Sequence, residues 1–179
     1  MSNTSGQLAN HAAELRVAFD QSFALPHRTD SEKGENLLEI RIGREAFALR
    51  LSEISGLFSE RKITPVPSPV TALMGVVSFR GNIMPVYNLQ AFFAQPLAEP
   101  PRWLAIAAQA PIALAFHHFD GHSQVLRDNL LPREEQQMAG RYVREFARLQ
   151  TLARPIVHVP SIIDAIRGQS TDIKSTRER

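Results

Sequence analysis

The sequence predicts a mainly β protein, built from two small barrels or from two copies of one strand pattern. Apolar and polar residues alternate at a period of two in residues 37–51, and the pattern restarts in residues 103–116. Prolines and glycines interrupt both groups at short intervals, which excludes long helices there. Each group ends in a stretch able to form a short helix, at residues 89–93 and 161–166.

Residues 1–36 form an N-terminal extension in which we expect one helix. Ser5 can cap a helix over residues 7–19. At helical spacing, one stripe of that helix holds Leu8, Ala12, Leu15 and Phe19. The helix either packs on the main domain or binds a partner. Residues 27–36 are polar and are expected to be a linker.

Two hairpins are predicted in the first strand group. Residues 38–51 alternate around a turn at residues 43–45. Three prolines in residues 64–69 prevent a central strand or a helix, and residues 70–74 can form a helical turn. The second hairpin, residues 75–89, turns at residues 80–82. Its second strand should place Ile83, Pro85 and Tyr87 on one face, and Met84, Val86 and Asn88 on the other.

The second strand group follows a proline-containing joint at residues 97–102. A hairpin is expected over residues 104–116, and a last strand over residues 156–159. Ser161 and Asp164 form a capping-box pattern for a short helix through Ile166.

Two stretches of the second half are less regular. Residues 133–149 fit a helix, although residues 141–146 alone could be a strand. Residues 169–179 are expected to be a polar tail.

Composition excludes several classes of function. The 179 residues carry a net charge of only +2, so the clustered basic field of a nucleic-acid-binding protein is not expected. There is no cysteine, which excludes disulfides, thiolate metal sites and cysteine nucleophiles. No apolar run approaches the length of a membrane span, and no secretory signal is visible at the N-terminus. We therefore expect a soluble cytoplasmic protein that does not insert into a membrane.

One short segment resembles a catalytic or metal site. His117, His118, Asp120 and His122 lie within six residues and could supply metal ligands. Adjacent histidines on a strand point to opposite faces, however, and no second histidine-rich segment supplies a further ligand. Nucleophile elbows and phosphate-binding glycine loops are absent from the sequence. We expect a protein without enzymatic activity, metal or cofactor; a metal-dependent enzyme and a nucleic-acid-binding barrel are the less favoured alternatives.

Residues 75–89 carry the most specific motif of the chain. The strings GVVSFRG at residues 75–81 and MPVYNL at residues 84–89 resemble the G-V-x-N-L-R-G and V-P-V-x-D-L stretches of CheW-like domains. The string ITPVPSP at residues 63–69 resembles the loop that precedes this motif in the family. The resemblance covers residues 37–168.

The resemblance implies two five-stranded, SH3-like barrels that share an apolar core, the first at about residues 37–96 and the second at about residues 103–168. It implies a non-enzymatic adaptor of bacterial chemosensory, two-component signal transduction. Its partners would be the regulatory domain of a CheA-type histidine kinase and the cytoplasmic tip of methyl-accepting chemoreceptors. The implied protein-binding residues are Arg80, Gly81, Ile54, Val86 and Asn88.

The chain departs from the family pattern at several positions. Ser78 replaces an Asn, Phe79 a Leu and Asn88 an Asp, while Gly56 falls where a Glu is common, with Glu53 one turn away. These departures leave a second hypothesis open: an adaptor of another chemosensory or motility pathway that binds receptor but not kinase.

Overall fold

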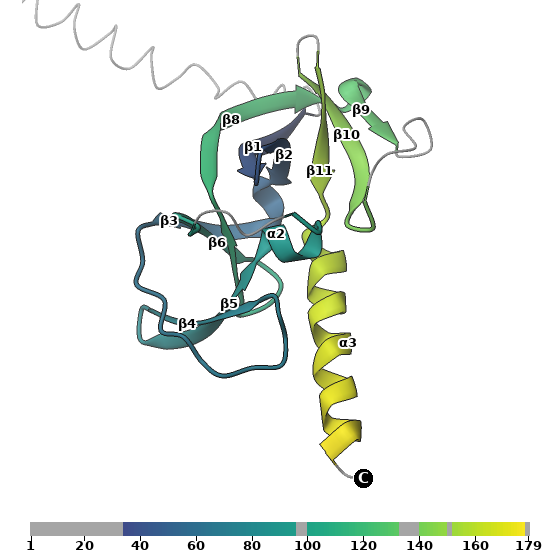
Figure 1. Ribbon diagram of the computed structural model, residues 1–179. Helices are drawn as coiled ribbons and strands as arrows, with labels where there is room; N and C mark the ends of the chain where they lie inside the picture. The colour runs from purple at the N-terminus through teal and green to yellow at the C-terminus, as the bar shows by residue number, and fades with distance from the viewer. Residues whose placement is uncertain (1–33, 96–99, 133–139, 150–151, 178–179) are drawn as a thin grey trace, which may run out of the picture. The chain divides into compact units, whose positions relative to one another are not determined.

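The computed structural model describes residues 34–95, 100–132, 140–149 and 152–177, with side chains to residue 169. All of them lie in one compact unit that begins at Gly34 (Figure 1). The strands are β1 (Gly34–Ile42), β2 (Glu45–Arg50), β3 (Ile54–Ser59), β4 (Leu73–Phe79), β5 (Asn82–Asn88), β6 (Trp103–Ala107), β7 (Ala113–Phe116), β8 (His118–Leu126), β9 (Leu130–Pro132), β10 (Val143–Leu149) and β11 (Leu152–Val157). The helices are η1 (Leu51–Glu53), η2 (Arg127–Asn129), α2 (Leu89–Phe92) and α3 (Val159–Arg177).

The strands form two sheets, but not in the two consecutive groups that the sequence predicted. Sheet A has the order β8-β1-β2-β11-β10-β9, and sheet B has the order β3-β6-β7-β5-β4. The first hairpin, β1–β2, thus joins the C-terminal strands, while β6 and β7 join β3–β5. The expected division into barrels at residues 37–96 and 103–168 is therefore wrong. Alternation reports which faces of a strand are buried, and it says nothing about which strand lies alongside.

Both sheets nevertheless repeat one pairing scheme, as the two similar strand groups indicated. In sheet B, β7 of the hairpin β6–β7 lies parallel to β5, and β5 leads into α2. In sheet A, β2 of the hairpin β1–β2 lies parallel to β11, and β11 leads into α3. Sheet A has six strands rather than the expected five, because η2 separates β8 from β9.

The core consists of three apolar clusters. One belongs to sheet B alone and includes Val77, Met84 and Val86. A second belongs to sheet A alone and includes Leu37, Ala48 and Ile156. The largest lies between the sheets and takes residues from both of them and from α3. Neighbouring residues of one strand therefore face different clusters, and strands such as β7 are buried on both faces.

Helix α3 differs from its prediction at both ends. Ser161 is not the cap, because the helix begins at Val159 and the backbone N–H of Ser161 donates to Nδ1 of His158 at 3.2 Å. Pro160 is tolerated in the first turn, where its missing N–H has no helical partner. The helix passes Ile166 and continues to Arg177, so residues 169–177 of the expected tail are helical. After Pro160 the chain contains no further proline to end the helix.

Several other expectations can be compared with the described residues. Residues 143–149 form a strand rather than part of the helix that residues 133–149 could have formed. Residues 70–74 are not helical, because β4 already begins at Leu73. Strand β1 includes residues 34–36, which were expected to belong to the linker. The predicted helix at residues 7–19 and the joint at residues 97–99 lie outside the described residues. Within the described part of the chain, no helix has the length and hydrophobicity that a membrane span requires.

Candidate partner-binding site

The β4–β5 hairpin places Arg80 at an exposed, sharply turned position. Phe79 pairs with Asn82, so that Arg80 and Gly81 alone form the loop. Both have positive φ, 48° for Arg80 and 81° for Gly81, as in the two-residue turns that match the twist of a hairpin. Glycine adopts this conformation freely, whereas a residue with a Cβ atom pays about 1 kcal/mol. Arg80 is thus held in a conformation that its own backbone disfavours, which points to a role for the side chain.

Arg80 belongs to a row of four side chains that we call the arginine–phenylalanine stack: Arg61, Phe58, Phe79 and Arg80. The guanidinium carbon of Arg80 lies 5.2 Å from the centroid of the Phe79 ring, and that of Arg61 lies 5.7 Å from the Phe58 ring. The two ring centroids are 4.2 Å apart. Both distances from guanidinium to ring are in the range of cation–π interactions.

A hollow of about 260 Å³ lies beside the stack. It is lined by Ser55, Phe58, Phe79, Arg80, Asn82, Met84 and Ile106. The side chain of Ile83 is 74% exposed and, on the strand alternation of β5, lies on the face opposite to Met84 and the hollow. The surface around Arg80 therefore combines cationic groups with apolar area, a composition found where proteins bind one another.

The predicted site residues do not all meet at this surface. Arg80 and Gly81 form the exposed turn. Ile54 is 9% exposed and packs in the core between the sheets, and Val86 is fully buried in the sheet B cluster. Asn88 is also buried, and its Oδ1 accepts the backbone N–H of Gln90 at 2.9 Å to cap α2. The strand alternation was predicted, but it did not tell which face of β5 points inward.

A second cluster of charged residues was missed at the sequence level. The guanidinium of Arg50 forms ion pairs with Glu35, Glu145 and Glu53. An oxygen of the Glu53 carboxylate accepts the backbone N–H of Val159 at 3.0 Å, at the first residue of α3. Glu53 therefore joins the connection between β2 and β3 to the C-terminal helix. The spacing of Arg50 and Glu53, three residues apart, was the available sequence signal.

At position 56, where a glutamate is common in the family pattern, glycine lies against the ring of Phe58. A Cβ atom on Gly56 would lie 2.7 Å from that ring, so a larger residue there would require the ring to move. In the segment that follows the first hairpin, the glutamate present is Glu53, which accepts the backbone N–H of Val159.

Burial and neighbouring charges shift three pKa values in this cluster. Burial raises the pKa of Glu53, against the opposing effects of the Val159 N–H and of Arg50. Burial also lowers the pKa of His158, and the positive charges of Arg144 and Arg50 act in the same direction. Burial alone would lower the pKa of Arg50, but its hydrogen bond to Glu35 and the nearby carboxylates raise it overall. The cluster thus favours a charged Arg50 and a neutral His158.

The histidine-rich segment does not assemble a metal site among the residues described. Both carboxylate oxygens of Asp120 accept from Nε of Arg41, at 3.0 and 3.1 Å. Arg154 lies 3.6 Å from the same carboxylate. In the described ranges, no group of three or more His, Asp or Glu side chains is arranged to hold an ion. Asp120 therefore serves an ion-pair network that crosses sheet A.

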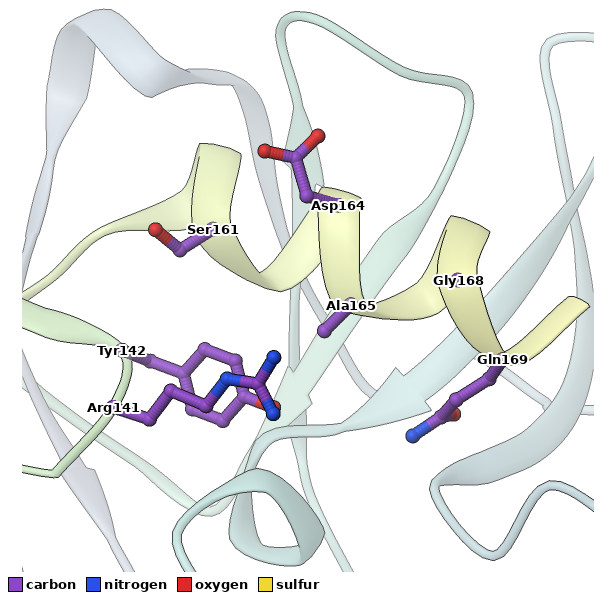
Figure 2. A pocket seen from close by; sticks show the side chains of 7 residues that line it. All are labelled: Arg141, Tyr142, Ser161, Asp164, Ala165, Gly168 and Gln169. Carbon is purple, nitrogen blue, oxygen red and sulfur yellow. The ribbon is translucent and has the colours of Figure 1, made fainter. Parts of the chain in front are cut away.

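A further hollow, of about 420 Å³, lies where the segment before β10 faces α3. Figure 2 shows Arg141 and Tyr142 on one side of it and Ala165 and Gln169 of α3 on the other. Ser161 also lines this hollow, and its Oγ lies 2.7 Å from Nδ1 of His158. That contact could be taken for a nucleophile with its base. The same ring nitrogen accepts the N–H of Ser161, however, so the pair serves as a helix cap.

Comparison with known proteins agrees with the fold and the hairpin motif. The model of the CheW-like domain family matches residues 36–167. The chemotaxis protein CheW of Rhizobium meliloti is 26% identical over 129 residues, which are 70% of this chain and 81% of that protein.

A solved structure gives the same result for the fold. The scaffolding protein TtCheW from Thermoanaerobacter tengcongensis superposes with a TM-score of 0.63 at 15% identity, over 69% of this chain and 88% of that one. The predicted class, a mainly β fold of two SH3-like barrels, is thereby confirmed. From the extent of the family match, the chain belongs to the CheW-like domain family.

Proposed function

We propose that this protein is a non-enzymatic adaptor of a chemosensory pathway, located in the cytoplasm. It would couple the cytoplasmic tip of a methyl-accepting chemoreceptor to the regulatory domain of a CheA-type histidine kinase. The observation that carries the proposal is the family match over residues 36–167. The name of the Rhizobium meliloti relative, a chemotaxis protein, supports it.

The geometry of the hairpin supports a role for Arg80 in this coupling. Its side chain is exposed, and within the described residues no carboxylate forms an ion pair with it. A cation held in a disfavoured backbone conformation, with its donors free for another molecule, is suited to bind a partner.

The structure offers no observation that favours the receptor-only alternative. That hypothesis depends on Asn88 and Gly56, and both residues have local structural explanations. Asn88 is buried and caps α2, and Gly56 leaves room for the ring of Phe58. We therefore propose that both partners bind.

Binding of the full chain to the two purified partners tests this proposal. The wild-type protein should bind the receptor tip and the kinase regulatory domain in separate titrations. Arg80→Ala should weaken at least one complex by roughly tenfold or more, as for a binding hot spot, and leave the fold unchanged. Arg127→Ala is the matched control, because Arg127 is exposed on η2 of the other barrel. If the wild type binds neither partner, the proposed function is overturned; binding of the receptor tip alone would support the receptor-only alternative.

A further inference from the structure

The arginine–phenylalanine stack keeps two cations without carboxylate partners on the surface of sheet B. Arg61 and Arg80 are both exposed, and neither forms an ion pair with a described residue. The carboxylate nearest in sequence, Glu60, is bound by Arg102 at 2.7 Å. Lys62 adds an exposed positive charge next to Arg61. Among the residues that the structure describes, no carboxylate therefore neutralises the charge of Arg61 or Arg80 through an ion pair.

Each guanidinium group lies over an aromatic ring, Arg61 over Phe58 and Arg80 over Phe79. A guanidinium that lies over a ring keeps its N–H donors at its edge, where they can meet a carboxylate with two parallel hydrogen bonds. The contact between Phe58 and Phe79, 4.2 Å between ring centroids, joins the two halves of the row.

Apolar surface adjoins these cations. The hollow of about 260 Å³ has Phe79 and Met84 in its wall. A large aliphatic or aromatic side chain can enter such a hollow and be desolvated there. The surface thus offers one apolar anchor point beside Arg80, whose charge attracts an anionic group.

We propose that the arginine–phenylalanine stack and its hollow form a docking surface for an acidic protein segment that carries one large apolar side chain. The inference rests on the proposed function. It specifies the kind of partner segment, acidic with one large apolar side chain, that would contact the β4–β5 hairpin. A nucleic acid fits this surface less well, because the two arginines already occupy ring faces on which bases would stack.

Arg61→Glu in the full chain is the decisive variant. Arg61 lies outside the family motif, so its effect reports on the stack rather than on the hairpin turn. Binding to the receptor tip and to the kinase regulatory domain is measured separately, at low and at high salt. We expect at least one of the two affinities to fall by roughly tenfold or more, with a smaller difference at high salt. Arg127→Glu makes the same charge change on the other barrel and should alter neither affinity by more than about twofold.

The outcomes separate the two proposals. Equal losses with Arg61→Glu and Arg127→Glu would indicate a general charge effect and would overturn the docking surface, as would unchanged binding by Arg61→Glu. If the wild type binds neither partner, the proposed function fails, and a synthetic peptide with glutamates around a single leucine becomes the probe. Wild-type binding of that peptide, lost in Arg61→Glu and retained in Arg127→Glu, would support the surface. No binding of the peptide by the wild type would overturn it.

Discussion

Arg80 occupies a backbone conformation that favours glycine, in the hairpin turn that we propose binds a partner. The turn between β4 and β5 requires positive φ at two positions, and glycine occupies only the second. The first position would be more stable with glycine, since no Cβ atom would then oppose the left-handed conformation. The proposed binding role of the side chain would account for an arginine at this position.

Replacement of this residue by glycine should separate stability from binding. We expect Arg80→Gly to raise the free energy of unfolding by roughly 0.5–1 kcal/mol, because backbone strain is relieved. The same variant should bind the kinase domain or the receptor tip more weakly than the wild type. Urea denaturation and a binding titration measure the two effects. A variant that loses stability as well as binding would show that Arg80 serves the fold.

Gly75 illustrates the opposite case, a glycine that the packing demands. Its φ is +149°, and an added Cβ atom would lie 2.1 Å from the carbonyl oxygen of Thr64. At this point residue 64 forms a bridge to Val76 beside β4. The first glycine of the hairpin motif therefore permits a close approach between two segments of the barrel.

Gly75→Ala should destabilise the protein by roughly 2–4 kcal/mol, because the clash involves backbone that cannot rotate away. Thermal and urea denaturation would measure the loss. Gly121→Ala is the control, since a Cβ atom there meets nothing within 4 Å, and its effect should stay within about 0.5 kcal/mol. Equal effects of the two substitutions would contradict the close-approach argument.

At the scale of elements, helix α3 is fixed by side chains that lie outside it. Glu53 accepts its first N–H, and His158 accepts the N–H of Ser161. Further along, Ile162, Ile163 and Ile166 enter the core between the sheets. A carboxylate at a helix N-terminus also interacts favourably with the helix dipole. The helix is thus attached to both the β2–β3 connection and the central core.

The cap formed by His158 predicts a dependence of stability on pH. Burial and the charges of Arg144 and Arg50 lower its pKa in the folded protein. The unfolded chain therefore binds the proton first as the pH falls. The contribution of neutral His158 to the free energy of unfolding is complete above its unfolded-state pKa, about 6.5. This contribution is lost as the pH falls through the folded-state pKa of His158.

His158→Asn keeps a capping acceptor that does not titrate. The free energy of unfolding of the variant should therefore rise relative to that of the wild type as the pH falls from about 7.5 to about 5.5. Urea denaturation of both proteins across this range gives the difference. Because Glu53 and the other carboxylates titrate in both proteins, their effects largely cancel in the comparison. A difference that stays constant with pH would exclude His158 as the source.

At the scale of the whole molecule, the two sheets depend on each other for completion. Sheet A takes β1 and β2 from the start of the described chain and its other strands from the end. Sheet B takes all its strands from the stretch between them. The parallel pairing of β2 with β11 joins residues more than one hundred positions apart. The protein is therefore expected to unfold as one cooperative unit.

Fragments cut at the predicted barrel boundary should not fold. A fragment of residues 34–96 would contain β1 and β2 without β8 and β11, and β3–β5 without β6 and β7. We expect it to show no cooperative transition in urea and little dispersion of its amide resonances, while the full chain unfolds in a single step. Cooperative unfolding of this fragment alone would contradict the assembly of the sheets.

Prediction from the sequence succeeded where a local pattern carries the information. The alternation in residues 38–51, the turn at Arg80 and the non-helical proline segment were all predicted from neighbouring residues, and the structure agrees. The burial of Val86 and Asn88 was not predicted, because both faces of β5 are covered by different clusters. The cluster around Arg50 was missed because Glu35, Glu53 and Glu145 come from three distant segments.

The sequence by itself determined the hairpins at residues 38–51 and 104–116, the hairpin that presents Arg80 and, through the motif of residues 75–89, the family. These properties depend on backbone conformations and side-chain alternation within a few residues. Only the tertiary structure decided which hairpin completes which sheet, what caps α3, and that Arg61 and Phe58 extend the row that begins at Arg80. These are contacts between distant segments, whose partners are selected by packing of the whole core rather than by local pattern.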